Sequence, residues 1–351
     1  MSTIEDVARR AGVSTATVSR VLSSPEVVLE TTRAKVLAAI NDLKYQPNYA
    51  AKSLRTLKSK RIVVTVPDIA NPFFSTVIRG VEEAAQEAGY AVLLGDTRHE
   101  PAREDLYASM LQRKEADGLI FLGHRLPGVL TDMVKDKHGR APVVNGCEFS
   151  PELGVSSVHI DNAKAAHEAV DLLYGLGHRR IGVITGMLAS PISRERLAGV
   201  RACAAQHGLG DELLVAIGDF SVGAGARETR SFLTGPKPPS AIFCFSDEMA
   251  MGSLRVIADL GLDCPADVSV IGFDDIGYAQ YLRPALTTIA QPKEEIGRET
   301  VKLMLGILRG DSAKPITKTL PHRLLVREST GKVKSRRRRQ GPQPAHRAVH
   351  G

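Results

Sequence analysis

Short apolar runs alternate with longer amphipathic stretches through most of this chain, from about residue 61 to residue 292. The runs are rich in β-branched residues and continuous in polarity, which is typical of strands buried on both faces of a parallel sheet. They cover residues 62–66, 90–94, 118–122, 143–144, 180–184, 241–245 and 268–271. Because the series divides near Asp161, we expect an α/β body of two doubly wound parallel-sheet lobes with a cleft between them.

The first sixty residues precede this body and follow a helical pattern. Apolar positions at helical spacing over residues 4–11 predict a first helix, which Thr3 caps and Gly12 ends. Ser14 caps a second helix, and the short glycine-containing turn between them is typical of a helix-turn-helix. The inward face of the second helix is expected to comprise Val18, Val21 and Leu22. A third stretch, residues 31–45, is expected to add Val36, Ala39, Ile40 and Leu43 to this small core.

The outward face of the second helix is expected to carry small or hydrogen-bonding side chains and one arginine. These are Thr15, Ala16, Thr17, Ser19 and Arg20. Small residues let a helix approach base edges, hydroxyl groups donate or accept hydrogen bonds, and an arginine can donate twice to guanine. The pattern therefore predicts binding to double-stranded DNA, and a three-helix bundle with a polar face is the plainer alternative.

The segment after Pro47 links the helical head to the body. Residues 48–57 have a helix-forming composition but are too few for a stable isolated helix. Leu54 is an apolar side chain in a polar and basic segment, as expected of a wedge between base steps in the minor groove, with Lys52 and Arg55 near phosphates. A linker with one buried leucine is the alternative.

The net charge of +7 is distributed unevenly. Residues 1–60 carry +5 and residues 331–351 carry +7, so that residues 61–330 carry −5. Basic ends on a mildly acidic body indicate contact with a polyanion at the ends. We expect the basic tail, 331–351, to be disordered, either as a solubility tail or as a non-specific DNA contact. It shows no leucine heptads, which favours a homodimer over a tetramer.

Several classes of function are disfavoured. No stretch approaches the ~20 apolar residues of a membrane span, and the N-terminus does not resemble a secretory signal, so we expect a cytoplasmic protein. No phosphate loop, HExxH or GxSxG motif occurs, so we expect neither an enzyme nor a cofactor. We also expect no CxxC pair, no histidine at metal-ligand spacing from a cysteine and no metal site. The cysteines expected to be buried reduced thiols are Cys147, Cys203, Cys244 and Cys264.

A series of motifs occurs in one order along residues 3–330. They are IEDVA at 4–8, GVSTATVSRVL at 12–22, AKSLR at 51–55, HIDN at 159–162, GHRRIG at 177–182, RLAG at 196–199, SDEMA at 246–250, IGFDD at 271–275 and LTTI at 286–289. Together they resemble the lactose/galactose-repressor family. The resemblance implies an all-α helix-turn-helix followed by a periplasmic-binding-protein-like body. It also implies a repressor that binds operator DNA as a homodimer and responds to a small-molecule effector.

The resemblance also implies a domain organisation and DNA contacts. The expected parts are a helix-turn-helix at 1–46, a hinge helix and linker at 47–60, an effector-binding and dimerisation domain at 61–330 and the tail at 331–351. The first lobe would comprise about 61–160 and 293–321, and the second 161–292 and 322–330. Bases would be read by Thr15, Ala16 and Arg20. Phosphates would be held by Ser14, Thr17, Ser19, Tyr45 and Asn48, and Leu54 would kink the operator centre.

Ligands of such sheets bind outside the carboxyl ends of the strands, where this chain places several acids. A ring of acids with one arginine suits a ligand rich in hydroxyl groups, and phenylalanines can stack on a flat ring. The effector is expected to contact Asp68, Asn71, Phe73, Phe74, Glu148, Asp161, Arg196, Phe220, Asp247, Asp274 and Gln291.

Further segments, among them 66–75, 122–127 and 288–299, resemble the cytidine-repressor branch of the family. That likeness implies a nucleoside effector, with Asp274 and Arg196 at the ribose and Phe73 and Phe220 near the base. A sugar or a purine remains an alternative effector. A solute-binding receptor of a transporter is the alternative from another class, although it would not carry residues 1–60.

Overall fold

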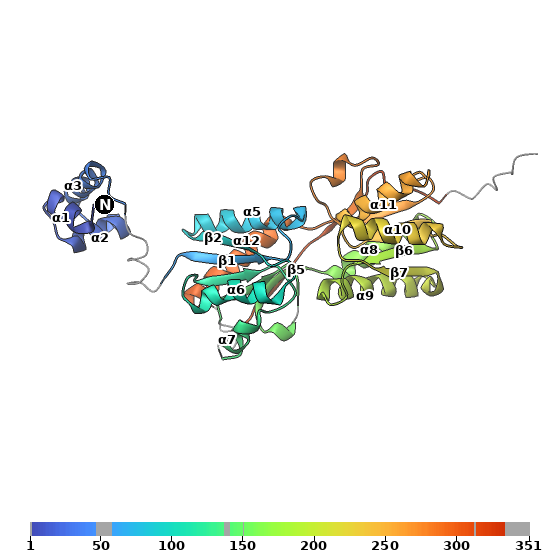
Figure 1. The fold of residues 1–351 in the computed structure, drawn as a ribbon, viewed down its shortest axis with the longest axis horizontal. Coiled ribbons are helices and arrows are strands. Elements are labelled where there is room, and N and C mark those ends of the chain that lie inside the picture. Colours follow the sequence, from blue (N-terminus) through green and yellow to red (C-terminus); the bar gives the residue numbers. More distant parts are fainter. Residues whose placement is uncertain (1, 47–57, 137–140, 150, 312–313, 334–351) are drawn as a thin grey trace, which may run out of the picture. The chain divides into compact units, whose positions relative to one another are not determined.

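The computed structural model describes residues 2–46, 58–136, 141–149, 151–311 and 314–333 (Figure 1). The chain divides into two compact units, Met1–Ser59 and Lys60–Gly351. The predicted hinge contacts Asn48, Leu54 and Arg55 lie outside the described residues, as does most of the basic tail. Among the described residues, no helix is both long enough and apolar enough to cross a membrane.

The first unit contains α1 (Ile4–Ala11), α2 (Thr15–Ser23) and α3 (Glu30–Asp42). The predicted end signals of α1 are confirmed. The Thr3 hydroxyl accepts a hydrogen bond from the Asp6 N–H, and the Asp6 carboxylate accepts one from the Thr3 N–H, which forms a capping box. Gly12 ends the helix with φ +67°, a conformation that strains most other residues, so the glycine permits the sharp turn into α2.

The three helices share a small apolar core. Its fully buried members are Val7, Ala8, Val18, Val21, Val36 and Ala39, and Ile40 and Leu43 pack against them. The prediction that Leu22 also faces inward is wrong, because its side chain is 36% exposed. Val18 and Val21 already fill the face of α2 that meets the other helices, and Leu22 lies further round the helix, at the edge of that face.

The second unit consists of two lobes, each built on a six-stranded sheet. The first sheet has the order β11-β5-β4-β3-β1-β2 and is parallel throughout. Its strands are β1 (Arg61–Val66), β2 (Ala91–Asp96), β3 (Gly118–Phe121), β4 (Val143–Gly146), β5 (Ser156–Ile160) and β11 (Thr317–Leu320). Its helices are α5 (Pro72–Glu87), α6 (Pro101–Gln112), α7 (Thr131–Asp136) and α12 (Lys293–Arg309).

The side chains of β1 explain why this sheet has helices on both faces. Ile62 and Val64 pack with residues of α5 and α12, whereas Val63 packs with residues of α6 and α7. Because successive side chains of a strand point to opposite faces, an uninterrupted apolar strand needs a helical layer on each side.

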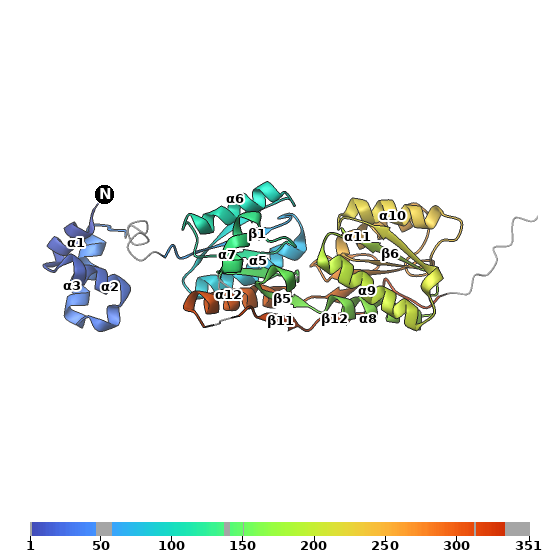
Figure 2. The same cartoon turned by 90° about the horizontal axis from the view of Figure 1, so that it is seen from below.

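The second sheet has the order β12-β10-β9-β8-β6-β7. Its strands are β6 (Ile181–Thr185), β7 (Leu213–Ile217), β8 (Ala241–Cys244), β9 (Ser269–Asp274), β10 (Thr287–Ala290) and β12 (Arg323–Leu325). It is parallel except for β12, which runs antiparallel to β10. The pair α8 (Asn162–Gly175) and α9 (Pro191–Gln206) covers one face, and α10 (Val222–Thr234) with α11 (Asp247–Asp259) covers the other (Figures 1 and 2). The predicted α/β architecture is therefore confirmed.

The chain passes between the two lobes three times. The passages lie between β5 and α8, between β10 and α12, and between β11 and β12. The first sheet is thus completed by β11, from the end of the described chain, and α12 returns to pack beside α5. Three connections hold the lobes together at one edge and leave the carboxyl ends of the strands as the place where a cavity can form.

Candidate DNA-binding helix and ligand cavity

The N-terminal half of α2 presents a polar surface. Ser14, Thr15, Ala16 and Arg20 are exposed, and Thr17 and Ser19 are partly buried. The Ser14 hydroxyl accepts a hydrogen bond from the Thr17 N–H at 3.2 Å and lies 3.0 Å from the Thr17 hydroxyl. The start of α2 therefore combines two hydroxyl groups with the partial positive charge of a helix N-terminus, a setting that favours phosphate oxygens.

Arg20 differs from its neighbours in the head. Arg10 donates to Asp42 at 2.9 Å, and Arg9 and Arg33 each lie beside an acid of their own helix. Within the described part of the chain, Arg20 makes no ion pair. An exposed arginine without an acidic partner keeps all of its donors available to an external acceptor. Tyr45 is partly buried against the head core.

A cavity of about 190 Å³ lies between the two lobes of the body, with room for one small molecule. Its lining residues follow the carboxyl ends of strands in both sheets, as the strand-end rule predicts. Nine of the eleven predicted effector contacts line it together. They are Asp68, Asn71, Phe73, Phe74, Glu148, Arg196, Phe220, Asp274 and Gln291.

The other two predicted contacts, Asp161 and Asp247, lie outside the lining. Asp161 is exposed at the N-terminus of α8, where its carboxylate accepts a hydrogen bond from the Lys164 N–H at 2.9 Å. Asp247 is fully buried and accepts from the Thr288 hydroxyl at 2.6 Å and from the Ile276 N–H at 2.8 Å. Both carboxylates stabilise local structure. The Asp161 carboxylate caps a helix, and the Asp247 carboxylate holds a neighbouring loop through its hydrogen bonds.

Several lining residues were missed by the sequence analysis. They are Pro67, His99, Leu122, His124, Cys147, Met187, Ser190, Ile192, Asp219, Ser221, Val222, Ser246 and Glu248. Met187 and Ser246 lie two residues after the ends of β6 and β8, so the strand-end rule would have found them had it been applied to uncharged residues. Ser190 and Ile192 belong to a loop and helix start that carry no such signal.

Arg196 is the cation of the cavity and is only 2% exposed. Its Nη1 donates to the Phe245 carbonyl at 2.6 Å, its Nε donates to Asn162 Oδ1 at 2.9 Å, and its guanidinium lies 3.5 Å from the centroid of the Phe273 ring. Two donated hydrogen bonds and a ring contact fix the guanidinium in one orientation. The arginine is therefore pre-positioned for a ligand acceptor.

The carboxyl groups of the cavity are strongly affected by burial. Burial raises the pKa of Glu148 to about 7, and it raises the pKa of Asp274 to about 6 against the opposing effect of the nearby Arg196 charge. Burial, reinforced by the charges of Asp274 and Asp68, raises the pKa of Glu248 to about 7. A ligand whose hydroxyl or amino groups donate to these carboxylates would replace the water that burial removes.

Three lining residues adopt backbone conformations that side-chain-bearing residues rarely take. Cys147 has φ +72°, Phe220 has φ +71° and Asp274 has φ +114°. The Asp274 segment is held from the other lobe, because Lys293 Nζ donates to the carbonyls of Asp274 at 2.6 Å and Asp275 at 2.7 Å. Strained residues concentrated at one cavity, and stabilised by contacts across it, are typical of a binding site.

Two family models match the chain. The model described as "Bacterial regulatory proteins, lacI family" matches residues 3–48, which contain α1, α2 and α3. The model described as "Periplasmic binding protein-like domain" matches residues 170–330. The first match lies within the first unit and contains the polar α2. The second lies within the second unit and contains about half of the cavity lining.

Full-length relatives combine both parts. The HTH-type transcriptional repressor CytR of Escherichia coli K12 is 41% identical over 94% of this chain and 96% of its own length. The HTH-type transcriptional repressor PurR of Photobacterium profundum is 34% identical over 94% of this chain and 98% of its own length. A lac repressor dimer, solved bound to operator and the anti-inducer ONPF, has a TM-score of 0.84 and 29% identity over 94% of this chain and 99% of its own.

Proposed function

Because this chain belongs to the LacI family of bacterial regulatory proteins, we propose that it represses transcription by binding an operator, and that a small effector changes its operator affinity. The observation that carries this proposal is the exposed polar face of α2, whose Arg20 makes no ion pair among the described residues. The chain acts as a regulator and not as an enzyme, and it works in the cytoplasm, where an operator is accessible.

In this proposal α2 enters the major groove of the operator. Thr15, Ala16 and Arg20 contact base edges, because small side chains allow close approach and an arginine donates twice to guanine. Phosphates are held by Ser14, Thr17, Ser19 and Tyr45, with Asn48 and Arg55 from the segment outside the described residues. Leu54 of that segment inserts at the operator centre.

We propose a nucleoside, with cytidine as the first candidate, as the effector. The cavity pairs acids and one arginine with the aromatic rings of Phe73 and Phe220, and a nucleoside pairs a hydroxyl-rich ribose with a flat base. Asp274 and Arg196 bind the ribose, and the phenylalanines contact the base. The remaining contacts are Asp68, Asn71, Phe74, Glu148 and Gln291. A sugar would contact only the acids and the arginine, and a purine base would contact mainly the phenylalanine rings.

We further propose that the chain acts as a homodimer. A helix-turn-helix reads a half-site, and two-fold symmetry lets two copies read a pseudo-palindrome. Tyr278 and Tyr281 are exposed on the second lobe, as expected of a surface that a second copy covers. Light scattering coupled to size-exclusion chromatography measures the mass directly, and a monomer at micromolar concentration would overturn this part of the proposal.

Effector binding is coupled to operator binding through the lobes. A ligand that contacts both lobes changes their relative orientation, and thereby the spacing of the two DNA-binding heads in a dimer. Coupling free energies are reciprocal, so a ligand that weakens operator binding must bind less tightly to the operator-bound protein by the same factor. Equal ligand affinity with and without operator would contradict this mechanism.

The proposed function is tested by selecting duplex DNA from a random pool with the purified full-length protein. We expect a pseudo-palindromic consensus whose affinity exceeds that of random competitor by about 10³-fold or more and falls steeply with salt. Failure to enrich any sequence, with and without each ligand of the panel below, would overturn the proposal.

The effector is tested by calorimetric titration with cytidine, uridine, adenosine, adenine, hypoxanthine, ribose and cellobiose. We expect cytidine to bind and to change operator affinity. If only a purine base or only a sugar binds, that class of ligand replaces the nucleoside as the proposed effector. The proposal that the protein binds an operator would be unaffected.

A further inference from the structure

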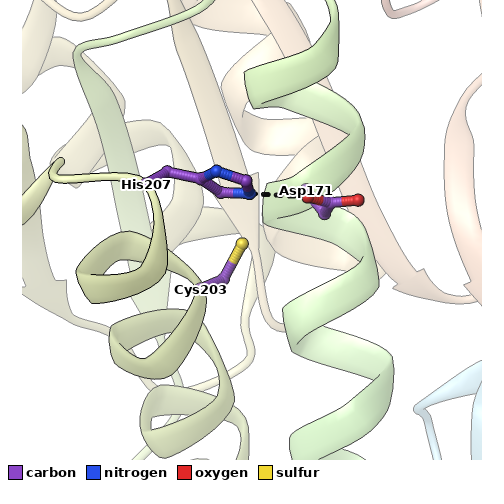
Figure 3. A group of neighbouring side chains, drawn as sticks. All are labelled: Asp171, Cys203 and His207. Carbon is purple, nitrogen blue, oxygen red and sulfur yellow. Dashed lines mark hydrogen bonds and ion pairs between the residues drawn. The ribbon is translucent and has the colours of Figure 1, made fainter.

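A second group of functional side chains lies on the second lobe, away from the cavity. Asp171 belongs to α8, Cys203 belongs to α9, and His207 directly follows α9 (Figure 3). Figure 3 shows the three side chains pointing toward one another across the gap between the two helices. One potential ligand atom from each residue lies within 4.8 Å of the others, and none of the three residues lines the effector cavity.

We propose that Asp171, Cys203 and His207 form a binding site for a thiophilic divalent cation, with Zn²⁺ as the best match. Thiolate, imidazole and carboxylate are the ligands that Zn²⁺ uses in proteins, usually in a tetrahedral arrangement. Three protein ligands and one water molecule complete such a site. A thiolate ligand selects against Mg²⁺ and Ca²⁺, which prefer oxygen ligands, and imidazole suits Zn²⁺, Ni²⁺ and Cu²⁺.

The arrangement fits a cation with small adjustments. Tetrahedral Zn²⁺ with bonds of about 2.0–2.3 Å separates neighbouring ligand atoms by roughly 3.3–3.7 Å. Here the His207 Nε2 and an Asp171 carboxylate oxygen are 2.7 Å apart in a hydrogen bond, and no pair in the group exceeds 4.8 Å. An entering cation would replace the hydrogen bond and move each ligand atom by about 1 Å or less.

The position of the His207 ring is fixed by neighbours that are not ligands. Its ring stacks on Tyr174 with centroids 3.8 Å apart and planes 11° apart. The Arg179 guanidinium lies 4.0 Å from the centroid of the same tyrosine ring. This support orients the imidazole toward Asp171 before any cation binds, in the way that outer residues orient metal-binding histidines.

The two helices that supply the ligands are held close together. A Cβ atom at Gly199 of α9 would lie 2.0 Å from the carbonyl oxygen of Ala163 in α8, so the backbones touch at this point. Cys203 lies one helical turn beyond Gly199 and His207 one turn further, on the same side of the helix. The close contact therefore fixes the distance between the α8 and α9 ligands.

The solvent exposure of the group provides an entry path. The Asp171 side chain is exposed, the His207 side chain is largely buried, and Cys203 lies beneath both. Burial and the nearby Asp171 charge raise the pKa of the Cys203 thiol to about 11, so the thiol is protonated at neutral pH and a bound cation displaces its proton into solvent. The expectation that no histidine lies at ligand spacing from a cysteine is thus wrong for Cys203 and His207, which are four residues apart.

The test uses the full-length protein, freed of metal with a chelator and titrated with Co²⁺ as a spectroscopic substitute for Zn²⁺. We expect a thiolate-to-cobalt charge-transfer band and intense visible bands typical of tetrahedral Co²⁺, both abolished by one equivalent of Zn²⁺. Cys203→Ala, His207→Asn and Asp171→Asn should each weaken binding at least tenfold, and the first should remove the charge-transfer band.

Matched controls identify the ligands and detect misfolding. Cys244→Ser removes a different buried thiol of the same lobe. His167→Gln removes a nearby histidine that is not a proposed ligand and that contacts the Gln206 side chain at 3.1 Å. Both should keep the bands. Zn²⁺ should raise the thermal unfolding midpoint of the parent protein and of the two controls but not of the three ligand variants, whose metal-free circular dichroism reports folding. No charge-transfer band in the parent, or an undiminished band in Cys203→Ala, would overturn the proposal.

Discussion

The hydroxyl group of Ser190 lies 3.0 Å from both carboxylate oxygens of Glu148 and donates to that carboxylate across the boundary between the lobes. Both side chains are buried, and both line the cavity. Glu148 follows β4 of the first lobe and Ser190 precedes α9 of the second. The contact between the lobes therefore depends on a carboxyl group whose pKa burial raises to about 7.

Replacing this carboxyl group should stabilise the ligand-free protein in a pH-dependent way. Glu148 has an ordinary pKa of 4.5 and a folded-state pKa of about 7, so the folded state holds a proton that the unfolded state has lost between these values. Its contribution to the free energy of unfolding thus falls as pH rises through this window. Glu148→Gln should raise the free energy of unfolding by about 2 kcal/mol more at pH 8 than at pH 5, measured by thermal unfolding.

Glu82→Gln is the matched control for that prediction, because Glu82 is an exposed acid of α5 in the same lobe. Its effect should be small at both pH values. An equal effect of Glu148→Gln at pH 5 and pH 8 would contradict the argument from burial.

Arg20 should carry sequence discrimination. Arg20→Ala should weaken binding to the selected operator by about 10–100-fold, because a bidentate arginine–guanine contact contributes about 1–3 kcal/mol. Binding to random DNA should change much less. Arg10→Ala is the control, since Arg10 is occupied by Asp42 at 2.9 Å. Fluorescence anisotropy with both duplexes measures the ratio, and a similar loss on both duplexes would show that Arg20 contacts only phosphate.

Arg196 should be needed both for the effector and for stability. Arg196→Met leaves the Phe245 carbonyl and Asn162 without their donors and the buried acids without a nearby positive charge. We expect loss of about 3 kcal/mol of stability and at least 100-fold weaker cytidine binding. Arg194→Met, on the exposed side of the same helix, should change cytidine affinity less than tenfold. Calorimetry and thermal unfolding provide the two measurements, and unchanged cytidine affinity in Arg196→Met would exclude the proposed contact.

The crossing of α8 and α9 should tolerate no side chain at Gly199. The added methyl group of Gly199→Ala would meet the Ala163 backbone at 2.0 Å, and backbone cannot rotate away, so we expect a loss of about 2 kcal/mol or more. Gly175→Ala, at the end of α8, places its methyl group in open space and should be neutral or stabilising by up to about 1 kcal/mol. Urea unfolding measures the free energy of unfolding of both variants. Equal values would contradict the close backbone contact between α8 and α9.

Much of the architecture follows from local sequence signals. The capping residues of α1 are separated by only three positions, and β1, β3 and β8 are apolar runs, so each of these is visible within a short window. Strands such as β5 and β11 contain several polar residues and were not predicted. The cavity was predicted by a topological rule, because parallel strands bring their carboxyl ends to one edge. Phe220 and Asp274 are distant in sequence and line the same cavity for this reason.

What could not be predicted depends on how helices and loops pack. The strand-end rule applies equally to Asp247 and Asp274, yet Asp247 turns inward to hold Ile276 and Thr288. Likewise, Asp171 lies in α8 and His207 directly follows α9, and only the close approach of these two helices brings them together. A sequence pattern predicts on which face of a helix or strand a side chain lies, but not which residue of another element packs against that face.

The pairing of β11 with β5 also sets the order in which a growing chain can fold. Ser157 and Thr317 are register partners 160 residues apart, so a ribosome synthesises all of β6 to β10 before the first sheet can close. At a synthesis rate of about 5–20 residues per second, the backbone groups at the edge of β5 remain unpaired for roughly 10–30 s. A message truncated before codon 317 would therefore yield a nascent protein with a folded head but an open sheet edge, a substrate for chaperones and proteases.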